Sequence, residues 1–235
     1  MEPGGRSKTD DVQRLLRADI LNGVWAPGTK LRFTELRERY RCSTGVVREA
    51  LPRLVGEGLV TAEPQLGFRV VTVSPEDLRD LTEARILLET MVLRSSIEQG
   101  DLAWETRLVA AHHLLAKLPR RTADGSPSLE WLSAHSAFHA ALGGGCGNGR
   151  MKTIVNSLRD SAEIYRCWTA KDDRALTREV EAEHRTILEA ALRRDADAAV
   201  AALTDHIQRS TDLLLHSQRQ PAGTGLDGRA GGDGS

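Results

Sequence analysis

The sequence predicts a mainly α-helical protein made of two unlike parts. Most segments of the 235-residue chain show helical periodicity, with apolar residues three and four positions apart. One short stretch around position 65 instead has the composition of a β-hairpin. Directly after it, Ser74-Pro75-Glu76-Asp77 is a strong signal for a new helix. We therefore expect a first domain over 8–73, a second domain over 74–219 and a disordered, Gly-rich tail over 220–235.

Three short amphipathic helices are expected at the start of the first domain. Each has an apolar face and a cap or turn at its ends. Thr34 is expected to cap the second helix. The expected ranges are 11–22, 35–40 and a third helix that opens at Ser43 or Thr44 and ends at Gly56 or Gly58, with a brief extended segment over 29–32.

Two β-rich runs, 59–63 and 68–73, follow these helices. The turn sequence Pro64-Gln65-Leu66-Gly67 separates them, as in a hairpin. Two short helices with a tight turn between them form a helix-turn-helix, and a hairpin directly after it forms a wing. The first domain is thus predicted to be a winged helix-turn-helix.

The second domain is predicted to be an all-α helical bundle, because no strand pattern interrupts its helical periodicity. The glycine cluster over 143–149 lacks the GxxxxGK[ST] arrangement of a phosphate loop, so we interpret it as a helix break. The expected helices are 75–99, 101–118, 128–142, 149–170, 175–194 and 196–218.

Composition excludes several classes of protein. No apolar run approaches the roughly 20 residues of a membrane-spanning helix, and the polar start has no signal-peptide segment, so a cytoplasmic protein without a membrane partner is expected. Cys42, Cys146 and Cys167 lack metal-site or disulfide spacing and should be reduced thiols. The net charge of −1 is an average over two unlike parts of the chain. Up to Ser74 there are 12 Lys and Arg and 9 Asp and Glu, and after Ser74 there are 20 Lys and Arg and 24 Asp and Glu.

The stretch 34–58, TELRERYRCSTGVVREALPRLVGEG, resembles the GntR superfamily of bacterial transcription regulators. The family pattern runs roughly S-R-T-P-V-R-E-A-L-x-x-L-x-x-E-G-L-V. The downstream helices resemble the FCD-type effector domain of the FadR branch. This resemblance implies a homodimeric regulator, a repressor and not an enzyme, with double-stranded operator DNA and a small-molecule effector as partners. The matching positions are Ser43, Val47, Arg48, Glu49, Ala50, Leu51, Leu54, Glu57, Gly58, Leu59 and Val60.

The residues expected to contact DNA lie at the start of the third helix and in the wing. A helix N-terminus with small polar side chains can approach phosphates and base edges in the major groove. Arg48 is the main candidate, since guanidinium pairs with phosphate or guanine. A surface salt bridge to Glu49 or Glu35 is its alternative role. The full expected set is Thr34, Ser43, Thr44, Gly45, Arg48 and Gly67, of which Ser43 could be only a helix cap and Gly67 only a turn residue.

Three departures from the family pattern affect recognition. Thr44 and Gly45 replace the usual Arg and Thr, and Leu66 replaces a common wing Arg, so fewer long basic groups should reach the groove. Pro52 lies inside the third helix, where it lacks an N–H and crowds the carbonyl of Arg48. A kink after the DNA-facing turn is expected.

Four histidines form a candidate metal site. His135 and His139 share a helix face at a spacing suited to chelation, and His184 and His206 lie on the last two helices. Metal-binding FCD domains have D-x-x-F-H on one helix and single histidines on two later ones, so the resemblance implies these four ligands, with His135 in place of Asp. Four imidazoles favour Zn²⁺ or Ni²⁺ over Mn²⁺. The alternatives are ordinary core histidines and an altered or empty site.

Arg85 matches a family position that faces the effector cavity, where it could bind a carboxylate. Its alternative role is an intrahelical pair with Glu89. The principal hypothesis is therefore a regulator controlled by a small organic acid that bridges the metal and Arg85. The rivals are a metal sensor, in which the metal is the signal, and a helical metalloenzyme, for which Glu183 beside His184 is the one supporting feature.

Overall fold

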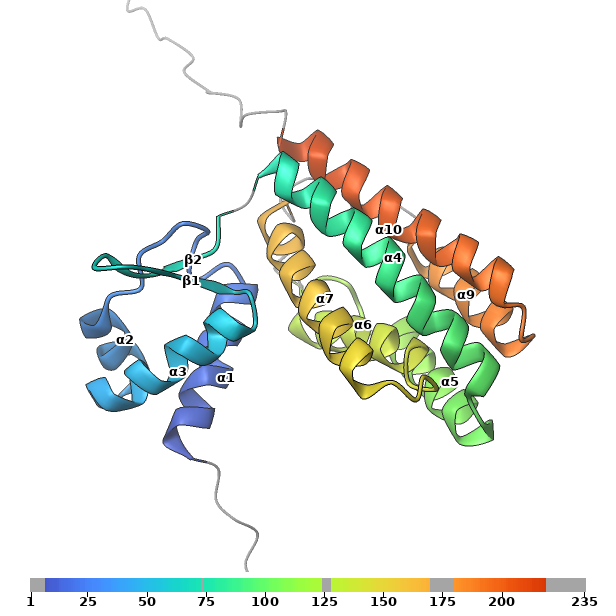
Figure 1. Ribbon diagram of the computed structural model, residues 1–235, viewed down its shortest axis with the longest axis horizontal. Helices are drawn as coiled ribbons and strands as arrows, with labels where there is room; N and C mark the ends of the chain where they lie inside the picture. The colour runs from blue at the N-terminus through green and yellow to red at the C-terminus, as the bar shows by residue number, and fades with distance from the viewer. Residues whose placement is uncertain (1–6, 73, 124–127, 170–179, 219–235) are drawn as a thin grey trace, which may run out of the picture.

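The computed structural model describes residues 7–72, 74–123, 128–169 and 180–218 and confirms the mainly α-helical fold. Two domains lie next to each other, and the chain passes from one to the other between strand β2 and helix α4 (Figure 1). The expected tail, 220–235, and the expected start of a helix at 175 lie outside the described residues. Within those residues, no helix has both the length and the apolar composition needed to cross a bilayer.

The first domain is a winged helix-turn-helix. Strands β1 and β2 are antiparallel, with Val60 opposite Val70 and Glu63 opposite Gly67. Lys30 adds an isolated bridge to Arg69, so the extended segment before the second helix joins the wing. The elements are α1 (Lys8–Leu21), α2 (Phe33–Tyr40), α3 (Thr44–Gly56), β1 (Val60–Glu63) and β2 (Gly67–Val70).

Two predicted helix starts in this domain were wrong. Helix α1 begins at Lys8, three residues before the expected start, because Ser7 and Asp10 form a capping box. Helix α2 begins at Phe33 after Arg32, and no side chain caps it. Thr34 therefore lies inside the first turn of α2 and does not cap it. Helix α3 starts as expected, with the Ser43 side chain accepting from Val46 N, and it continues through Pro52 to Gly56.

A single apolar core holds the three helices against the wing. Leu16 and Ile20 of α1 meet Leu51 and Leu54 of α3, all fully buried. These residues occupy the three- and four-residue steps that place side chains on one helix face. The opposite face of α3 stays exposed, which leaves the Arg48 side free for a partner.

Where the structure describes it, the second domain is a bundle of helices, as predicted. Helix α4 packs against α10 and α7, α5 packs against α6 and α9, and α9 packs against α10 (Figure 1). Trp104 and Phe138 are the largest side chains at its centre. The helices are α4 (Pro75–Gln99), α5 (Leu102–Lys117), α6 (Leu129–Leu142), α7 (Gly149–Thr169), α9 (Val180–Leu192) and α10 (Ala196–Gln218).

The glycine cluster between α6 and α7 is a close-packed turn. A Cβ added to Gly145 would lie 2.5 Å from the carbonyl oxygen of Ser96 and 2.9 Å from the Cα of Gly100. The N–H of Cys146 donates to Ser96 Oγ at 2.9 Å. Only glycine permits this approach to the end of α4. Close packing therefore explains the high glycine content of the turn, and no phosphate ligand is needed to explain it. Cys42 and Cys146 are free cysteines, and the side chain of Cys167 lies outside the description.

Candidate metal centre and DNA-binding surface

The structure brings the four predicted histidines together inside the second domain. His135 and His139 come from α6, His184 from α9 and His206 from α10. Each is only 2–3% exposed, and one ligand atom from each residue lies within 4.8 Å of all the others. The ring centroids of His135 and His139 are 4.6 Å apart, and those of His184 and His206 are 4.8 Å apart.

The four imidazole rings lie together because each histidine occupies a core-facing position on its helix. Phe138 is fully buried between the two histidines of α6. Ile187 lies three residues after His184, and Ile207 directly follows His206; both are fully buried. An imidazole in such a stripe is carried inward with its apolar neighbours.

Three residues that the sequence analysis did not assign to this cluster contact its histidines. The Oε2 of Glu183 lies 2.8 Å from the Nδ1 of His206. A carboxylate at that distance accepts the Nδ1 proton, which leaves the Nε2 lone pair of His206 for coordination. The Oε1 of Glu163, on α7, lies 3.8 Å from the Nδ1 of His135. The Trp131 ring stacks on His135, with centroids 4.9 Å apart.

The donor set suits a borderline divalent ion. Two nitrogens at the usual Zn–N bond length are roughly 3.4 Å apart across one tetrahedral ion. The ligand atoms of the cluster lie within 4.8 Å of one another, so inward shifts of up to about 1 Å per side chain would bring them to bonding distance. Imidazole nitrogens fit Zn²⁺ and Ni²⁺, and Glu183 supplies the carboxylate partner common around metal-bound histidines.

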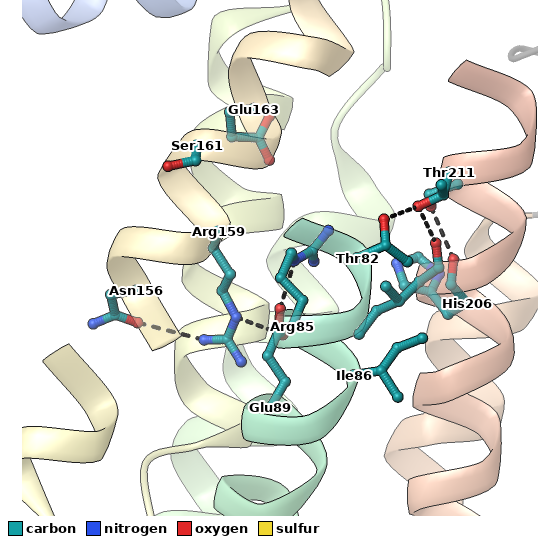
Figure 2. A network of polar contacts seen from close by, with 12 residues as sticks. Thr82, Arg85, Ile86, Glu89, Asn156, Arg159, Ser161, Glu163, His206 and Thr211 are labelled. Atoms are coloured by element: carbon teal, nitrogen blue, oxygen red, sulfur yellow. Dashed lines mark hydrogen bonds and ion pairs between the residues drawn. The ribbon is translucent and has the colours of Figure 1, made fainter. Parts of the chain in front are cut away.

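Arg85 lies in a buried network of two arginines around one carboxylate. Its Nε donates to Glu89 Oε1 at 2.7 Å, and the Nε of Arg159, on α7, donates to Glu89 Oε2 at 2.7 Å. Figure 2 shows both guanidinium groups turned toward Glu89. Burial raises the pKa of Glu89, but the two positive charges outweigh it, and the net pKa lies below its ordinary value. The intrahelical pair considered for Arg85 is therefore present.

Helix α7 also joins the second domain to the first. The Nη2 of Arg17, on α1, lies 2.5 Å from the Oδ1 of Asp160. The Nε of Arg17 lies 3.2 Å from the Oε2 of Glu57, at the end of α3. Ile164 of α7 is fully buried in the core of the first domain. The Tyr165 hydroxyl bonds to Asp77, at the start of α4. One helix thus contacts the histidine cluster through Glu163 and the DNA-binding domain through its neighbours.

The residues expected at the DNA interface lie on exposed parts of the first domain. Thr34, Ser43, Gly45 and Arg48 are exposed, and Thr44 is partly exposed. Within the part of the chain that the structure describes, neither acid considered for Arg48 pairs with it: Glu49 accepts from Thr9 Oγ1, and Glu35 pairs with Arg32. Ser43 caps α3, and Gly67 adopts a φ of +97° in the wing turn. Leu66, at 57% exposure, lies beside Gly67.

A winged helix-turn-helix followed by a helical bundle with a buried cluster of four histidines is the architecture of a DNA-binding transcription regulator. In comparisons with known families, a model of the bacterial regulatory proteins of the gntR family matches residues 8–70, and a model of the FCD domain matches residues 80–209. The chain therefore belongs to the GntR family and carries an FCD domain. It is a transcription regulator and not an enzyme.

Relatives and solved structures agree with this assignment. The HTH-type transcriptional regulator BphR of Paraburkholderia xenovorans is 38% identical, covering 89% of this chain and 86% of its own. The HTH-type transcriptional repressor GlaR of Escherichia coli is 35% identical, covering 84% and 91%. The structure of E. coli McbR/YncC has the same fold, with a TM-score of 0.76 at 21% identity, covering 92% of this chain and all of that one.

Proposed function

We propose that this chain is a dimeric repressor whose helical domain holds a Zn²⁺ or Ni²⁺ ion and responds to a small organic acid by changing its affinity for operator DNA. The observation that carries the proposal is the buried cluster of four histidines in a domain joined by α7 to a winged helix. The similarity to the repressor GlaR supports the sign of the regulation. Action on chromosomal DNA implies a cytoplasmic location.

His135, His139, His184 and His206 would hold the ion, with Glu183 fixing the orientation of His206. A bound divalent ion would supply Lewis-acid positions for an anionic oxygen. Arg85 is the second group proposed for the effector carboxylate, through its terminal amino groups, while its Nε keeps the contact with Glu89. A single ligand could then contact the histidine cluster and the α4–α7 network.

The first domain would recognise DNA through the N-terminal turn of α3. Arg48 is exposed at the side of the buried stripe of α3, and Thr44 and Gly45 leave room for close approach of the backbone. Thr34 and Ser43 would contact phosphates, and Gly67 would let the wing approach the minor groove. Two such domains related by a dyad would read inverted half-sites.

The dimer interface is proposed on the outer faces of α4 and α7. Leu87 and Met91 are 61% and 52% exposed and lie one turn apart on α4. Ile154 of the neighbouring α7 is 51% exposed. Apolar side chains gathered on two adjacent helices favour burial against a partner, and a second copy would place both α7 helices near the dyad.

Metal content tests the proposal. Purified protein incubated with Zn²⁺ and desalted should retain about one ion per chain by elemental analysis, because four imidazoles converge on one point. His139→Ala and His184→Ala should lose it, whereas His216→Ala, an exposed histidine near the end of α10, should keep it. Wild-type protein that is metal-free after this treatment would contradict the metal site.

A metal sensor is the second candidate function. It is favoured by the presence of four protein ligands, because a tetrahedral ion bound by all four would have no open position for an effector. Operator affinity measured with and without Zn²⁺, in the absence of any acid, separates the two functions. A large effect of the metal alone identifies a sensor, and an effect of the acid at constant metal identifies an effector-controlled repressor.

A further inference from the structure

The wing carries a lysine that the DNA contacts proposed above do not use. Lys30 lies in the extended segment before α2, and its backbone forms an isolated antiparallel bridge with Arg69 of β2. The N–H of Leu31, the next residue, donates to the carbonyl oxygen of Phe68 at 2.8 Å. This segment therefore lies beside β2, and the backbone of Lys30 is held at a fixed place in the wing.

The side chain of Lys30 is exposed and extends toward the turn of the hairpin. A Cβ added to Gly67 would lie 4.0 Å from the Cε of Lys30, so the end of the lysine side chain lies beside the glycine of that turn. Gly67 has no side chain to cover the ammonium group, and its neighbours Gln65 and Leu66 are themselves exposed. A phosphate can therefore reach Lys30 from outside the wing.

Two positive side chains belong to the partners of this bridge. Like charges directly opposite each other on neighbouring strands are destabilising. Arg69 has its own partners, because its Nε donates to the Oε2 of Glu63 at 3.0 Å and its Nη1 donates to the carbonyl oxygen of Gly28 at 3.1 Å. Among the residues that the structure describes, none forms an ion pair or a hydrogen bond with the ammonium group of Lys30. An anion bound at Lys30 would offset its repulsion with Arg69.

From this geometry we propose that Lys30 binds a phosphate of the DNA backbone when the wing lies on the duplex. An ammonium group is a point charge with three donors, and a phosphate contact carries no sequence information. Lys30 therefore adds affinity for any duplex, whereas sequence discrimination comes from Arg48 and the start of α3. The proposal rests on the DNA recognition proposed above and deepens it, and it requires neither a metal nor an effector.

The salt dependence of DNA binding tests this contact. Fluorescence anisotropy on the full chain, over a range of KCl concentrations, uses a duplex that wild type selects from a random pool and a scrambled duplex of the same composition. Each phosphate neutralised contributes about 0.9 to the slope of log K against log salt, so Lys30→Gln should lower the magnitude of the slope by about 0.9 for each wing that binds. Both duplexes should lose affinity by a similar factor, at least about threefold at roughly 0.1 M salt. Lys30→Arg should bind as wild type does, because it keeps the charge.

Lys117→Gln is the matched control, because it removes the same charge from an exposed lysine at the end of α5, and it should keep the wild-type slope. Three results would overturn the contact: an unchanged slope in Lys30→Gln, an equal change in Lys117→Gln, or a loss of affinity confined to the selected duplex, which would make Lys30 a base contact. These results would leave DNA recognition by the chain intact. A wild-type protein that selects no duplex would contradict DNA recognition itself and this contact with it.

Discussion

Arg48 is the residue on which DNA recognition should depend most. Its side chain is exposed on the face of α3 away from the core, and Glu49 and Glu35 are engaged by Thr9 and Arg32. We expect Arg48→Ala to weaken operator binding by about 1–3 kcal/mol, the cost of losing a bidentate base contact, while stability stays unchanged. Fluorescence anisotropy with a DNA duplex selected from a random pool by the wild-type protein measures this. Wild-type affinity in the variant would remove Arg48 from the interface.

Glu89 should be a major contributor to the stability of the second domain at neutral pH. It is fully buried and accepts from the buried Arg85 and the partly buried Arg159, so Glu89→Gln would leave two cations without a carboxylate. The expected loss is about 3–5 kcal/mol, visible as a lower urea midpoint. Glu76→Gln is the control, because Glu76 is exposed and its Oε1 lies 3.8 Å from the Nη1 of Arg79. This variant should change the free energy of unfolding by less than about 0.5 kcal/mol.

The contribution of Glu89 should also depend on pH. Its pKa in the folded protein lies below the ordinary value of 4.5, so its stabilising effect is complete above that pH. As the pH falls through the lowered folded value, the carboxylate gains a proton and the effect is lost. Wild type and Glu89→Gln should therefore converge in stability in acid. A difference that stays constant from pH 7 to pH 3 would contradict this account.

Helix α7 is the element that connects the second domain to the winged helix-turn-helix. Glu163 faces His135, Arg159 pairs with Glu89 of α4, and Asp160 binds Arg17 of α1. Arg17 in turn contacts Glu57 at the end of the recognition helix. A shift of α7 on ligand binding would therefore be transmitted to α3 through two ion pairs.

Asp160→Asn should weaken this coupling without altering either site. Ligand-dependent regulation typically represents a coupling of about 1–3 kcal/mol, and the variant should lose at least half of it. Metal content, acid affinity and operator affinity without acid should match wild type. Asp80→Asn, an exposed residue of α4, is the control. A full acid response in Asp160→Asn would show that the signal takes another route.

The helices and the His135–His139 pair could be predicted from local spacing, whereas His184 and His206 could be added only through the resemblance to FCD domains. The start of α1 was missed because the cap Ser7 and Asp10 precede the apolar stripe, which opens at Val12. The contact of Glu183 with His206 joins two helices, so no spacing along the chain reveals it. Ile164 follows the period of α7 but is buried in the core of the other domain, a placement that depends on tertiary packing.

The whole molecule is expected to act as a dimer, and the exposed apolar residues of α4 and α7 test this. Leu87→Asp would place a charge inside the proposed interface, which should raise the dimer dissociation constant at least tenfold. Sedimentation equilibrium measures the change. Leu102→Asp, at a residue of α5 that is 76% exposed, should leave the dimer intact. Equal association of the two variants would place the interface elsewhere.

We expect above all that a ligand bound beside the four histidines changes the affinity of the winged helix-turn-helix domains for operator DNA. This expectation is tested by titrating the operator complex with two small organic acids, benzoate and hexanoate, at constant Zn²⁺, in wild type and in His184→Ala. His184 belongs to the histidine cluster and also lines the pocket beside it. We predict that an acid lowers the operator affinity of wild type about 5- to 150-fold, and that His184→Ala keeps its affinity but loses the response. An equal response in the two proteins would contradict the account.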